Sequence, residues 1–153
     1  MRIAFGTDDV TPVTTAMLEH LRGAGHDVNV IAYPDPWGMA GRRVAEEVRD
    51  RRAELGVVCC FTGTGVSIAA NKVRGARAAL CTDAATARGA RRWNDANVVA
   101  LGLRLTTQTT AAEILDAFLD PTIEVAESEQ VNIAHLDDPL DDPLDGPLDG
   151  PAA

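Results

Sequence analysis

The sequence predicts a single-domain α/β protein with a three-layer, doubly wound, Rossmann-like fold around a five-stranded parallel sheet. Short apolar segments alternate with amphipathic segments along the chain, and this alternation of strands and helices is typical of parallel sheets. The segment at 55–61 is apolar at every position, as a strand covered on both faces should be. The length of 153 residues and the apolar content of 46% suit one core of ordinary size.

The first strand is expected at 2–5, where an apolar run ends at a glycine. Pro12 suits the first turn of a helix. That helix is expected to reach about Ala24, because Gly25 can supply the left-handed stop that ends many helices. A second strand is expected over 27–33, where apolar and polar residues alternate.

The middle of the chain continues the same alternation. Residues 39–53 have the pattern of a charged amphipathic helix. Residues 55–61 form the continuously apolar segment and therefore predict a central strand. A short helix is expected over 66–73, and a fourth strand over 76–80.

Two helix-capping signals organise the last third of the domain. Asp83 is expected to cap a helix that runs to residue 93, and a fifth strand follows over 97–101. The segment Thr110-Ala-Ala-Glu113 has the pattern of a capping box, so a helix is expected to begin there and to run to residue 119. A last helix is expected within 124–136.

Residues 137–153 form a four-residue repeat, DDPL-DDPL-DGPL-DGPA. Proline at every fourth position is incompatible with a helix and removes donors that a sheet would need. The sequence therefore predicts a folded domain at 1–136 followed by a disordered acidic tail at 137–153. The tail is interpreted as a passive solubilising segment, with docking to a partner as the alternative.

Charge and composition exclude several classes of protein. The net charge is −9, but six Asp of the tail leave only −3 on residues 1–136. No basic stripe is present, so nucleic-acid binding is disfavoured. No apolar run approaches the roughly 20 residues that a membrane-spanning helix needs, and the N-terminus has no signal-peptide pattern. Three cysteines, two of them adjacent, do not form a disulfide framework, so a cytoplasmic protein is expected.

The most informative segment is the turn after the central strand, Cys59-Cys60-Phe61-Thr62-Gly63-Thr64-Gly65. A strand, a glycine turn and a helix follow one another here, and the N–H groups at such a helix start favour an anion or a developing oxyanion. The turn lacks the Gly-Lys-Ser/Thr of a phosphate-binding loop and the third glycine of a dinucleotide loop. A tight structural turn with no chemical role is the alternative.

Several strings together resemble the family of type B ribose-5-phosphate isomerases and galactose-6-phosphate isomerase subunits. The resemblance covers residues 1 to about 120. Its strings are Ile3-Ala-x-Gly-x-Asp8, Thr62-Gly-Thr-Gly-Val-Ser-Ile-Ala-Ala-Asn-Lys72, Gly75-x-Arg77-Ala-Ala-Leu-Cys81, Ala87-Arg88, Asn94-Asp-Ala-Asn97 and Leu101-Gly-x-Arg104.

This resemblance implies an aldose–ketose isomerase that needs no cofactor and moves a proton between C1 and C2 of an open-chain sugar through a cis-enediol. It also implies a homodimer or a dimer of dimers, with the active site at a subunit interface. Cys60 falls on the catalytic cysteine of the family, and Thr62 on the hydroxyl that supports this base. The other positions carried over are substrate-binding: Asp8, Gly63, Thr64, Gly65, Asn94 and Arg104.

The sequence departs from the family pattern at two positions where the family has histidine. Asp9 stands after the first-loop Asp, and Trp93 stands before Asn94, where the family's ring-opening His is usual. We count Asp9 and Trp93 among the substrate-binding residues. The three histidines of the chain lie elsewhere and are interpreted as surface or boundary residues.

The phosphate clamp of the family is also missing. The family usually has two Arg in its C-terminal segment, whereas Ala126-Glu-Ser-Glu-Gln-Val-Asn132 has none and adds two carboxylates. Arg104, and Arg88 or Arg92, remain as candidates for holding an anion. Phe61 replaces a small residue beside Cys60. Either Trp37 or the Tyr33-Pro34 pair occupies the place of a pocket Tyr.

We therefore expect an isomerase that keeps its proton-transfer residues but acts on an unphosphorylated, short or differently anchored sugar. The main alternative is a non-catalytic partner subunit of a heteromeric sugar-phosphate isomerase, and a regulatory sugar-binding module is a weaker one. No metal site is expected, because adjacent Cys59 and Cys60 should point to opposite faces of a strand and no His stands at zinc spacing.

Overall fold

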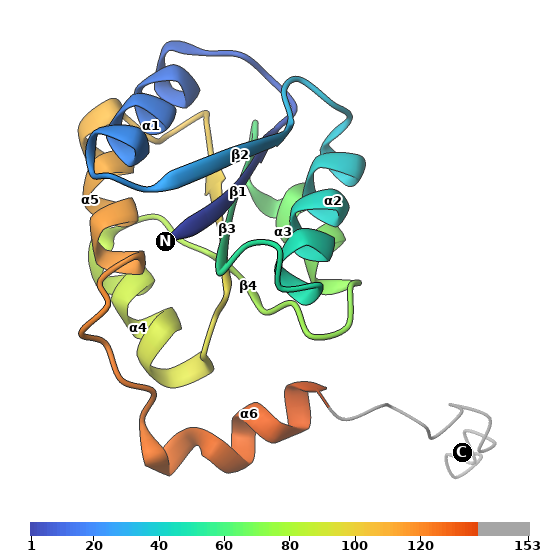
Figure 1. The fold of residues 1–153 in the computed structure, drawn as a ribbon, viewed down its shortest axis with the longest axis vertical. Helices are drawn as coiled ribbons and strands as arrows, with labels where there is room; N and C mark the ends of the chain where they lie inside the picture. The colour runs from blue at the N-terminus through green and yellow to red at the C-terminus, as the bar shows by residue number, and fades with distance from the viewer. Residues whose placement is uncertain (138–153) are drawn as a thin grey trace, which may run out of the picture.

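The computed structural model describes residues 1–137 and confirms the α/β fold. All five strands are parallel, in the order β2-β1-β3-β5-β4. Helices α1, α4 and α5 cover one face of the sheet and α2 and α3 cover the other (Figure 1). The strands are β1 (Arg2–Thr7), β2 (Asp27–Ala32), β3 (Leu55–Cys60), β4 (Ala78–Leu80) and β5 (Val98–Gly102); the helices are α1 (Pro12–Gly23), α2 (Trp37–Arg49), α3 (Thr64–Asn71), α4 (Ala84–Asn94), α5 (Gln108–Phe118), the 3-10 turn η1 (Glu127–Glu129) and α6 (Gln130–Asp137).

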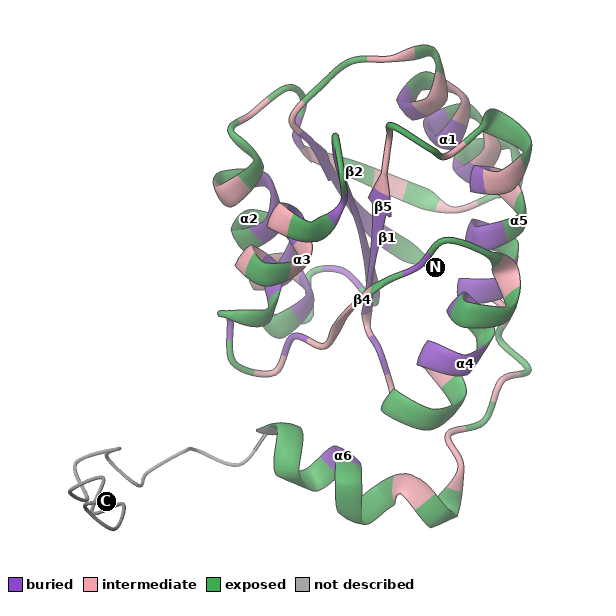
Figure 2. Cartoon of the chain, turned by 180° about the vertical axis from the view of Figure 1, so that it is seen from behind, coloured by how far each residue is buried: buried purple, intermediate pink, exposed green. Residues whose placement is uncertain are grey.

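Strand β3 lies at the centre of the sheet, and every one of its six residues is buried. This confirms the interpretation of its apolar run as a strand covered on both faces. Figure 2 shows the buried sheet between helices whose outer faces are exposed. Cys59 packs in the cluster on the α1, α4 and α5 side, whereas Cys60 packs in the cluster on the α2 and α3 side. The two neighbouring thiols therefore lie in different layers, as expected.

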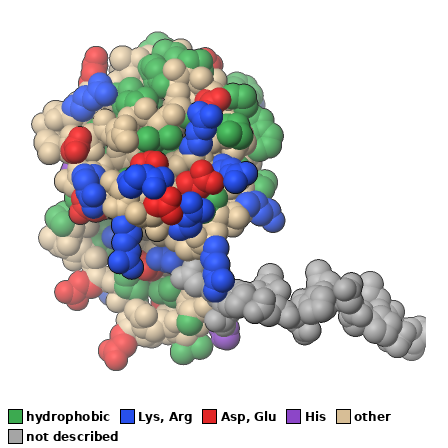
Figure 3. All heavy atoms as spheres, turned by 45° about the vertical axis from the view of Figure 1, so that its right-hand side comes forward, with side chains coloured by type: hydrophobic (Ala, Val, Ile, Leu, Met, Phe, Trp, Pro, Cys, Tyr) green, Lys and Arg blue, Asp and Glu red, His purple; other side chains and the backbone are tan. Residues whose placement is uncertain are grey.

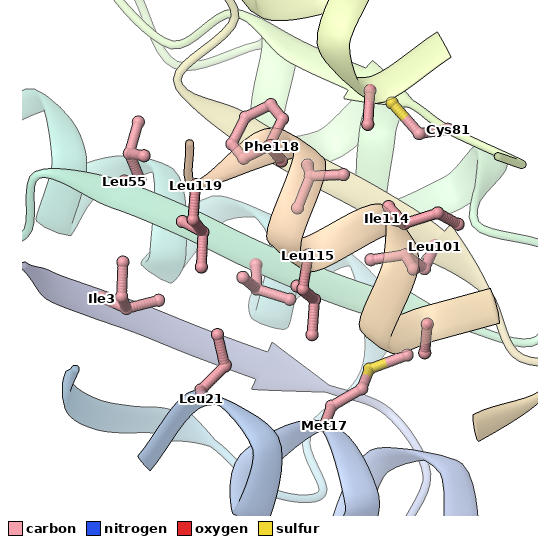
Figure 4. Close-up of a cluster of buried hydrophobic side chains, with 14 of the residues drawn as sticks. Ile3, Met17, Leu21, Leu55, Cys81, Leu101, Ile114, Leu115, Phe118 and Leu119 are labelled. Atoms are coloured by element: carbon pink, nitrogen blue, oxygen red, sulfur yellow. The ribbon is translucent and has the colours of Figure 1, made fainter. Parts of the chain in front are cut away.

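The larger of the two clusters is almost entirely aliphatic. Figure 4 shows side chains of α1 and α5 meeting residues of the sheet, with Phe118 at the end of α5 as the one labelled ring. With aromatic residues at only 4% of the chain, the core depends on close packing of Leu, Ile, Val and Ala. This packing fixes α5 across the sheet and so sets the position of the loop after β5.

Several helix boundaries differ from those expected; the short helix expected over 66–73, for example, is α3 and runs from Thr64 to Asn71. Helix α2 begins at Trp37 and ends at Arg49, four residues before the expected end, because Arg51 takes a left-handed φ of 59° that a helix cannot continue through. The expected capping box at Thr110 is wrong. Thr107 is the N-cap of α5, and its hydroxyl accepts the N–H of Thr110 at 3.1 Å. A threonine three residues earlier therefore makes the capping bond.

The short edge strand β4 is closed by a side chain. The Asn71 amide donates to the Ala78 carbonyl and accepts the Ala78 N–H, both at 2.8 Å. These are the two groups that a further parallel strand would pair with. Asn71 is the last residue of α3. The residue at which this helix ends therefore also covers the outer edge of the sheet.

The helix expected within 124–136 is present as η1 followed by α6. Among the residues of α6 whose burial is described, Ile133 alone is buried, while Val131 and Leu136 are exposed. The tail predicted at 137–153 lies outside the described residues, except that Asp137 ends α6. None of the helices in the described part of the chain is long and apolar enough to cross a membrane.

The capping assignment gives a direct test. Replacement of Thr107 by Ala should lower the free energy of unfolding by about 1 kcal/mol, because an N-cap hydroxyl is lost. Thr110→Ala should cost less, since it leaves the N–H of residue 110 bonded to Thr107. Urea denaturation of the two variants measures both values, and an equal or larger loss for Thr110→Ala would contradict the assignment.

Candidate active site at the glycine turn

The turn from β3 to α3 is built on close approaches that only glycine permits. Gly63 is the N-cap of α3 and has a φ of 77°, in the left-handed region that favours glycine. A Cβ on Gly63 would lie 2.8 Å from the backbone N of Gly102, and one on Gly102 would lie 2.7 Å from the carbonyl O of Thr62. The turn is therefore pressed against the end of β5.

Cys60 is the last residue of β3 and is 4% exposed. Its Sγ accepts the backbone N–H of Gly63 at 3.2 Å. The turn therefore directs a backbone hydrogen-bond donor at the sulfur of Cys60. Cys59 differs, because its complete burial raises the pKa of its thiol; it packs against Met17 and belongs to the core.

The turn after Cys60 also carries two neighbouring hydroxyl groups. Thr62 Oγ1 and Thr64 Oγ1 lie 2.7 Å apart, and both residues are exposed. Thr64 and Gly65 are the first two residues of α3, and the first N–H groups of a helix have no acceptor within it. The turn thus combines hydroxyls with backbone N–H groups that are free of helical acceptors, which are the kinds of group that can stabilise an oxyanion.

Asp8 follows β1 at the same end of the sheet. Its backbone N–H points at the carbonyl of Cys59, at 3.4 Å. Its Oδ1 is buried and has no hydrogen-bond partner among the described residues. Burial raises the pKa of the Asp8 carboxyl, a backbone hydrogen bond opposes this, and the charge of Asp9 adds to it. Asp9 itself is exposed, and its backbone is held by the Thr7 hydroxyl.

A cavity of about 390 Å³ opens beside the turn. Thr62 lines it from the turn after β3, and Arg104 lines it from the loop after β5. The backbone N–H of Arg104 donates to the carbonyl of Phe61 at 2.9 Å, which fixes the start of this loop to the turn. The Arg104 side chain forms no ion pair within residues 1–137, so its charge is available to an anionic group.

The structure also adds contacts that were not deduced from the sequence. The Trp37 ring lies against Gly65, where a Cβ would come within 2.9 Å of the ring. Of the two candidates for the pocket aromatic, Trp37 is therefore the one that contacts the turn. The role of Gly102 was missed as well, although its place in the Leu101-Gly-x-Arg104 string was a usable signal.

Trp93 and Asn94 are not brought to the turn. They end α4, which runs against the direction of the strands, so they lie near the amino ends of β4 and β5 (Figure 1). Arg77 lies just before β4, and its guanidinium donates to the carbonyl of Asp95 at 2.8 Å. This bond places the end of α4 beside the start of β4. Within one chain, these two residues therefore lie at the opposite end of the sheet from Cys60.

The other ionisable groups considered above lie apart from the turn. Arg88 and Arg92 line a cavity of about 550 Å³ together with Asp120, Glu124 and Glu127. His20 pairs with Asp116 at 2.6 Å between α1 and α5. Within residues 1–137 no three His, Cys, Asp or Glu side chains are grouped in a way that could hold a metal ion.

Comparison with known proteins gives a consistent result. The family model described as "Ribose/Galactose Isomerase" matches residues 3–136. The galactose-6-phosphate isomerase subunit LacB of Clostridium acetobutylicum is 36% identical over 143 residues, which is 90% of this chain and 83% of the relative. A D-erythrulose-4-phosphate isomerase of Pectobacterium atrosepticum is 35% identical over 131 residues, which is 81% of this chain and 86% of the relative.

Solved structures agree in the whole fold. Ribose-5-phosphate isomerase B of Clostridium thermocellum superposes with a TM-score of 0.82 at 33% identity, covering 90% of this chain and 95% of that one. The Thermotoga maritima ribose 5-phosphate isomerase gives a TM-score of 0.81 at 30% identity, covering 89% and 97% of the two chains. The similarity thus includes the sheet, the helices and the turn that carries Cys60.

The strain in the turn can be measured with a matched pair of glycines. Gly63 and Gly75 have nearly equal φ values, 77° and 82°, but a Cβ on Gly75 would meet nothing within 4 Å. Gly75→Ala should cost about 1–2 kcal/mol for left-handed strain alone. Gly63→Ala should cost more, because steric overlap of this kind adds about 1–3 kcal/mol. Chemical denaturation compares the two, and equal losses would contradict the close contact described here.

The raised pKa of Asp8 predicts a pH-dependent effect on stability. Because the folded state holds the Asp8 proton more tightly, ionisation opposes folding as the pH rises above the ordinary value of 3.8. Asp8→Asn should therefore raise the melting temperature at pH 7, by about 1–2 °C because the carboxyl is partly solvated. The gain should vanish below pH 3.8. Asp9→Asn is the control, with a smaller expected gain.

Proposed function

Since the chain belongs to the ribose/galactose isomerase family, we propose that it is a cofactor-free aldose–ketose isomerase that acts through a cis-enediol or enediolate. The observation that carries this proposal is the Cys60 thiol, held at the end of β3 and bonded by the N–H of Gly63. Cys60 falls on the position of the family's catalytic cysteine, and the thiolate is the form of a cysteine that can abstract a proton.

In this mechanism the Cys60 thiolate removes the proton from the carbon next to the sugar carbonyl. The electron pair moves into a C1–C2 double bond and leaves negative charge on the former carbonyl oxygen. Because the N–H of Gly63 is bonded to the sulfur, the N–H groups of Thr64 and Gly65 are the donors assigned to that oxygen. The thiol then returns the proton to the other carbon, and one proton moves between the two oxygens, so that the product is an isomer.

Two further groups have supporting roles in this proposal. The Thr62 hydroxyl, 2.7 Å from that of Thr64, supports the base and orients the sugar. The unpartnered Oδ1 of Asp8 binds a sugar hydroxyl, which would supply the hydrogen bond that this buried oxygen lacks. Asp9 lies at the rim of the same site.

We propose that the substrate is anchored differently from the phosphosugars of typical family members. The C-terminal segment brings Glu127 and Glu129 and no arginine, so it would repel a phosphate. Arg104 in the cavity beside Thr62 is the guanidinium assigned to any anionic group of the substrate. An unphosphorylated sugar, or a short one held by this single arginine, fits these charges.

A substrate that is always open-chain would also explain Trp93 in place of a ring-opening histidine. The relative named D-erythrulose-4-phosphate isomerase illustrates the chemistry. A four-carbon sugar with its terminal oxygen esterified has no hydroxyl that can close a five-membered ring, and therefore needs no ring opening. We extend this class of short, open-chain sugar to the present chain.

We further propose a homodimer, or a dimer of dimers, with the active site at the interface. Trp93 and Asn94 lie at the opposite end of the sheet from Cys60 within one chain, so a second copy is needed to bring them to the substrate. Exposed apolar residues beside the turn support such a contact, with Phe61 at 66% and Leu105 at 80% exposure.

Three unpaired, buried cysteines support a reducing, cytoplasmic setting.

A second candidate is a partner subunit that contributes only part of a heteromeric site. It is favoured by the relative that is itself named a subunit of galactose-6-phosphate isomerase. The retained Cys60, Thr62 and glycines favour the active enzyme instead. In both cases the folded domain is proposed to be 1–136, with the tail outside the catalytic unit.

Proton exchange with solvent tests the proposal directly. The chain is expressed without a partner and assayed in D₂O. It should catalyse deuterium incorporation at C1 or C2 of short or unphosphorylated sugars faster than into ribose 5-phosphate. Cys60→Ala should lower this rate about 10²–10⁴-fold, the usual contribution of a general base. Cys59→Ala is the matched control, since complete burial in the core raises the pKa of that thiol and leaves it unreactive.

Three results would contradict the proposal in different ways. Unchanged exchange in Cys60→Ala would remove Cys60 as the base. Ribose 5-phosphate turnover as fast as that of typical relatives would remove the altered substrate. Exchange into none of the sugars tested, recovered only when a second protein is added, would favour the partner subunit.

A further inference from the structure

A basic patch lies on the α2 and α3 side of the molecule, away from the glycine turn. It consists of Arg42, Arg49, Lys72 and Arg74, which line a hollow of about 310 Å³ with Glu46. Figure 3 shows Lys and Arg side chains gathered on this side of the molecule. The patch is unexpected, because residues 1–136 carry a net charge of −3.

The charge of the patch is only partly balanced. Arg42 pairs with Glu46 at 2.9 Å and Arg49 pairs with Asp50 at 2.7 Å. Lys72 and Arg74 form no ion pair within residues 1–137. Two exposed cations, two positions apart in the chain just after α3, therefore remain unpaired once the local pairs are formed.

The chain itself contains a segment of complementary charge. Residues 138–153 have five Asp, four Pro and neither Lys nor Arg. This segment begins close to the patch, because Leu136 lines a cavity of about 500 Å³ together with Asn71, the residue before Lys72. Sixteen residues can extend over about 50 Å, so the segment is long enough to reach all four cations.

From this juxtaposition we propose that the basic patch is the docking surface for residues 138–153 of the same chain. Asp residues of the repeat bind Lys72 and Arg74 and compete for Arg42 and Arg49. Proline at every fourth position reduces the conformational freedom lost on docking. The covalent connection keeps the local concentration of the segment in the millimolar range, so the chain's own tail is favoured over a second copy or a soluble polyanion.

Paramagnetic relaxation in the full chain tests this docking. A spin label is attached to Ala153→Cys, a position chosen because the three native cysteines are buried. At low ionic strength the amide signals of residues 72–74 should lose intensity. The loss should disappear when salt is raised from 0.01 to 1 M, which shortens the Debye length from about 30 Å to about 3 Å.

Charge reversal identifies the surface. The double variant Lys72→Glu, Arg74→Glu should restore the signals of residues 72–74. Arg22→Glu is the matched control, because Arg22 is an exposed arginine at the end of α1, outside the patch, and it should leave the signal loss unchanged. The chain without the introduced cysteine, treated with the same label, controls for reaction at Cys60.

Two outcomes would overturn the proposal. Full signal intensity at residues 72–74 at low salt, or a loss that survives the double charge reversal, would show that the patch does not bind the tail. Chains that carry only the isotope can also be mixed with chains that carry only the spin label. Signal loss in this mixture, with no loss when the doubly labelled chain is diluted in unlabelled chain, would assign the docking to a second copy. Because neither readout uses activity, the result is independent of the proposed reaction.

Discussion

The close approach between the turn after β3 and the end of β5 determines the shape of the candidate site. Two glycines, Gly63 and Gly102, face each other without side chains, and the backbone of the turn can therefore double back over the strand end. That path directs the Gly63 N–H at the Cys60 sulfur. It also brings the Arg104 loop beside Thr62, and both line one cavity. A side chain at either glycine would separate these parts.

The two adjacent cysteines show how a strand assigns different chemistry to identical side chains. Cys59 and Cys60 differ by one position and therefore lie on opposite faces of the sheet. Cys59 is enclosed by the larger aliphatic cluster, where burial raises the pKa of its thiol. Cys60 lies at the same strand end but meets the N–H of the turn. The sheet thus keeps one thiol inert and leaves its neighbour beside the site.

The fold could be predicted from the sequence, and so could the strand, glycine turn and helix that form the candidate site, because these follow from local patterns. The apolar run of β3 and the glycines after it are such patterns. The capping of α5 was misassigned, since Thr107 and Thr110 offer the same hydroxyl at a spacing of three. The separation of Trp93 from Cys60 depends on the antiparallel course of α4, and the single chain therefore leaves their joint role as a proposal.

Asn71 gives one more consequence of the fold. Its position in the string shared with the isomerase family invites a chemical role, yet its amide is fully used by the backbone of Ala78. In effect one side chain imitates the missing neighbour of the outermost strand. An uncovered strand edge is a template on which chains can stack into fibres. Because Asn71 covers this edge, it occupies the backbone groups of Ala78 with which another chain could otherwise pair.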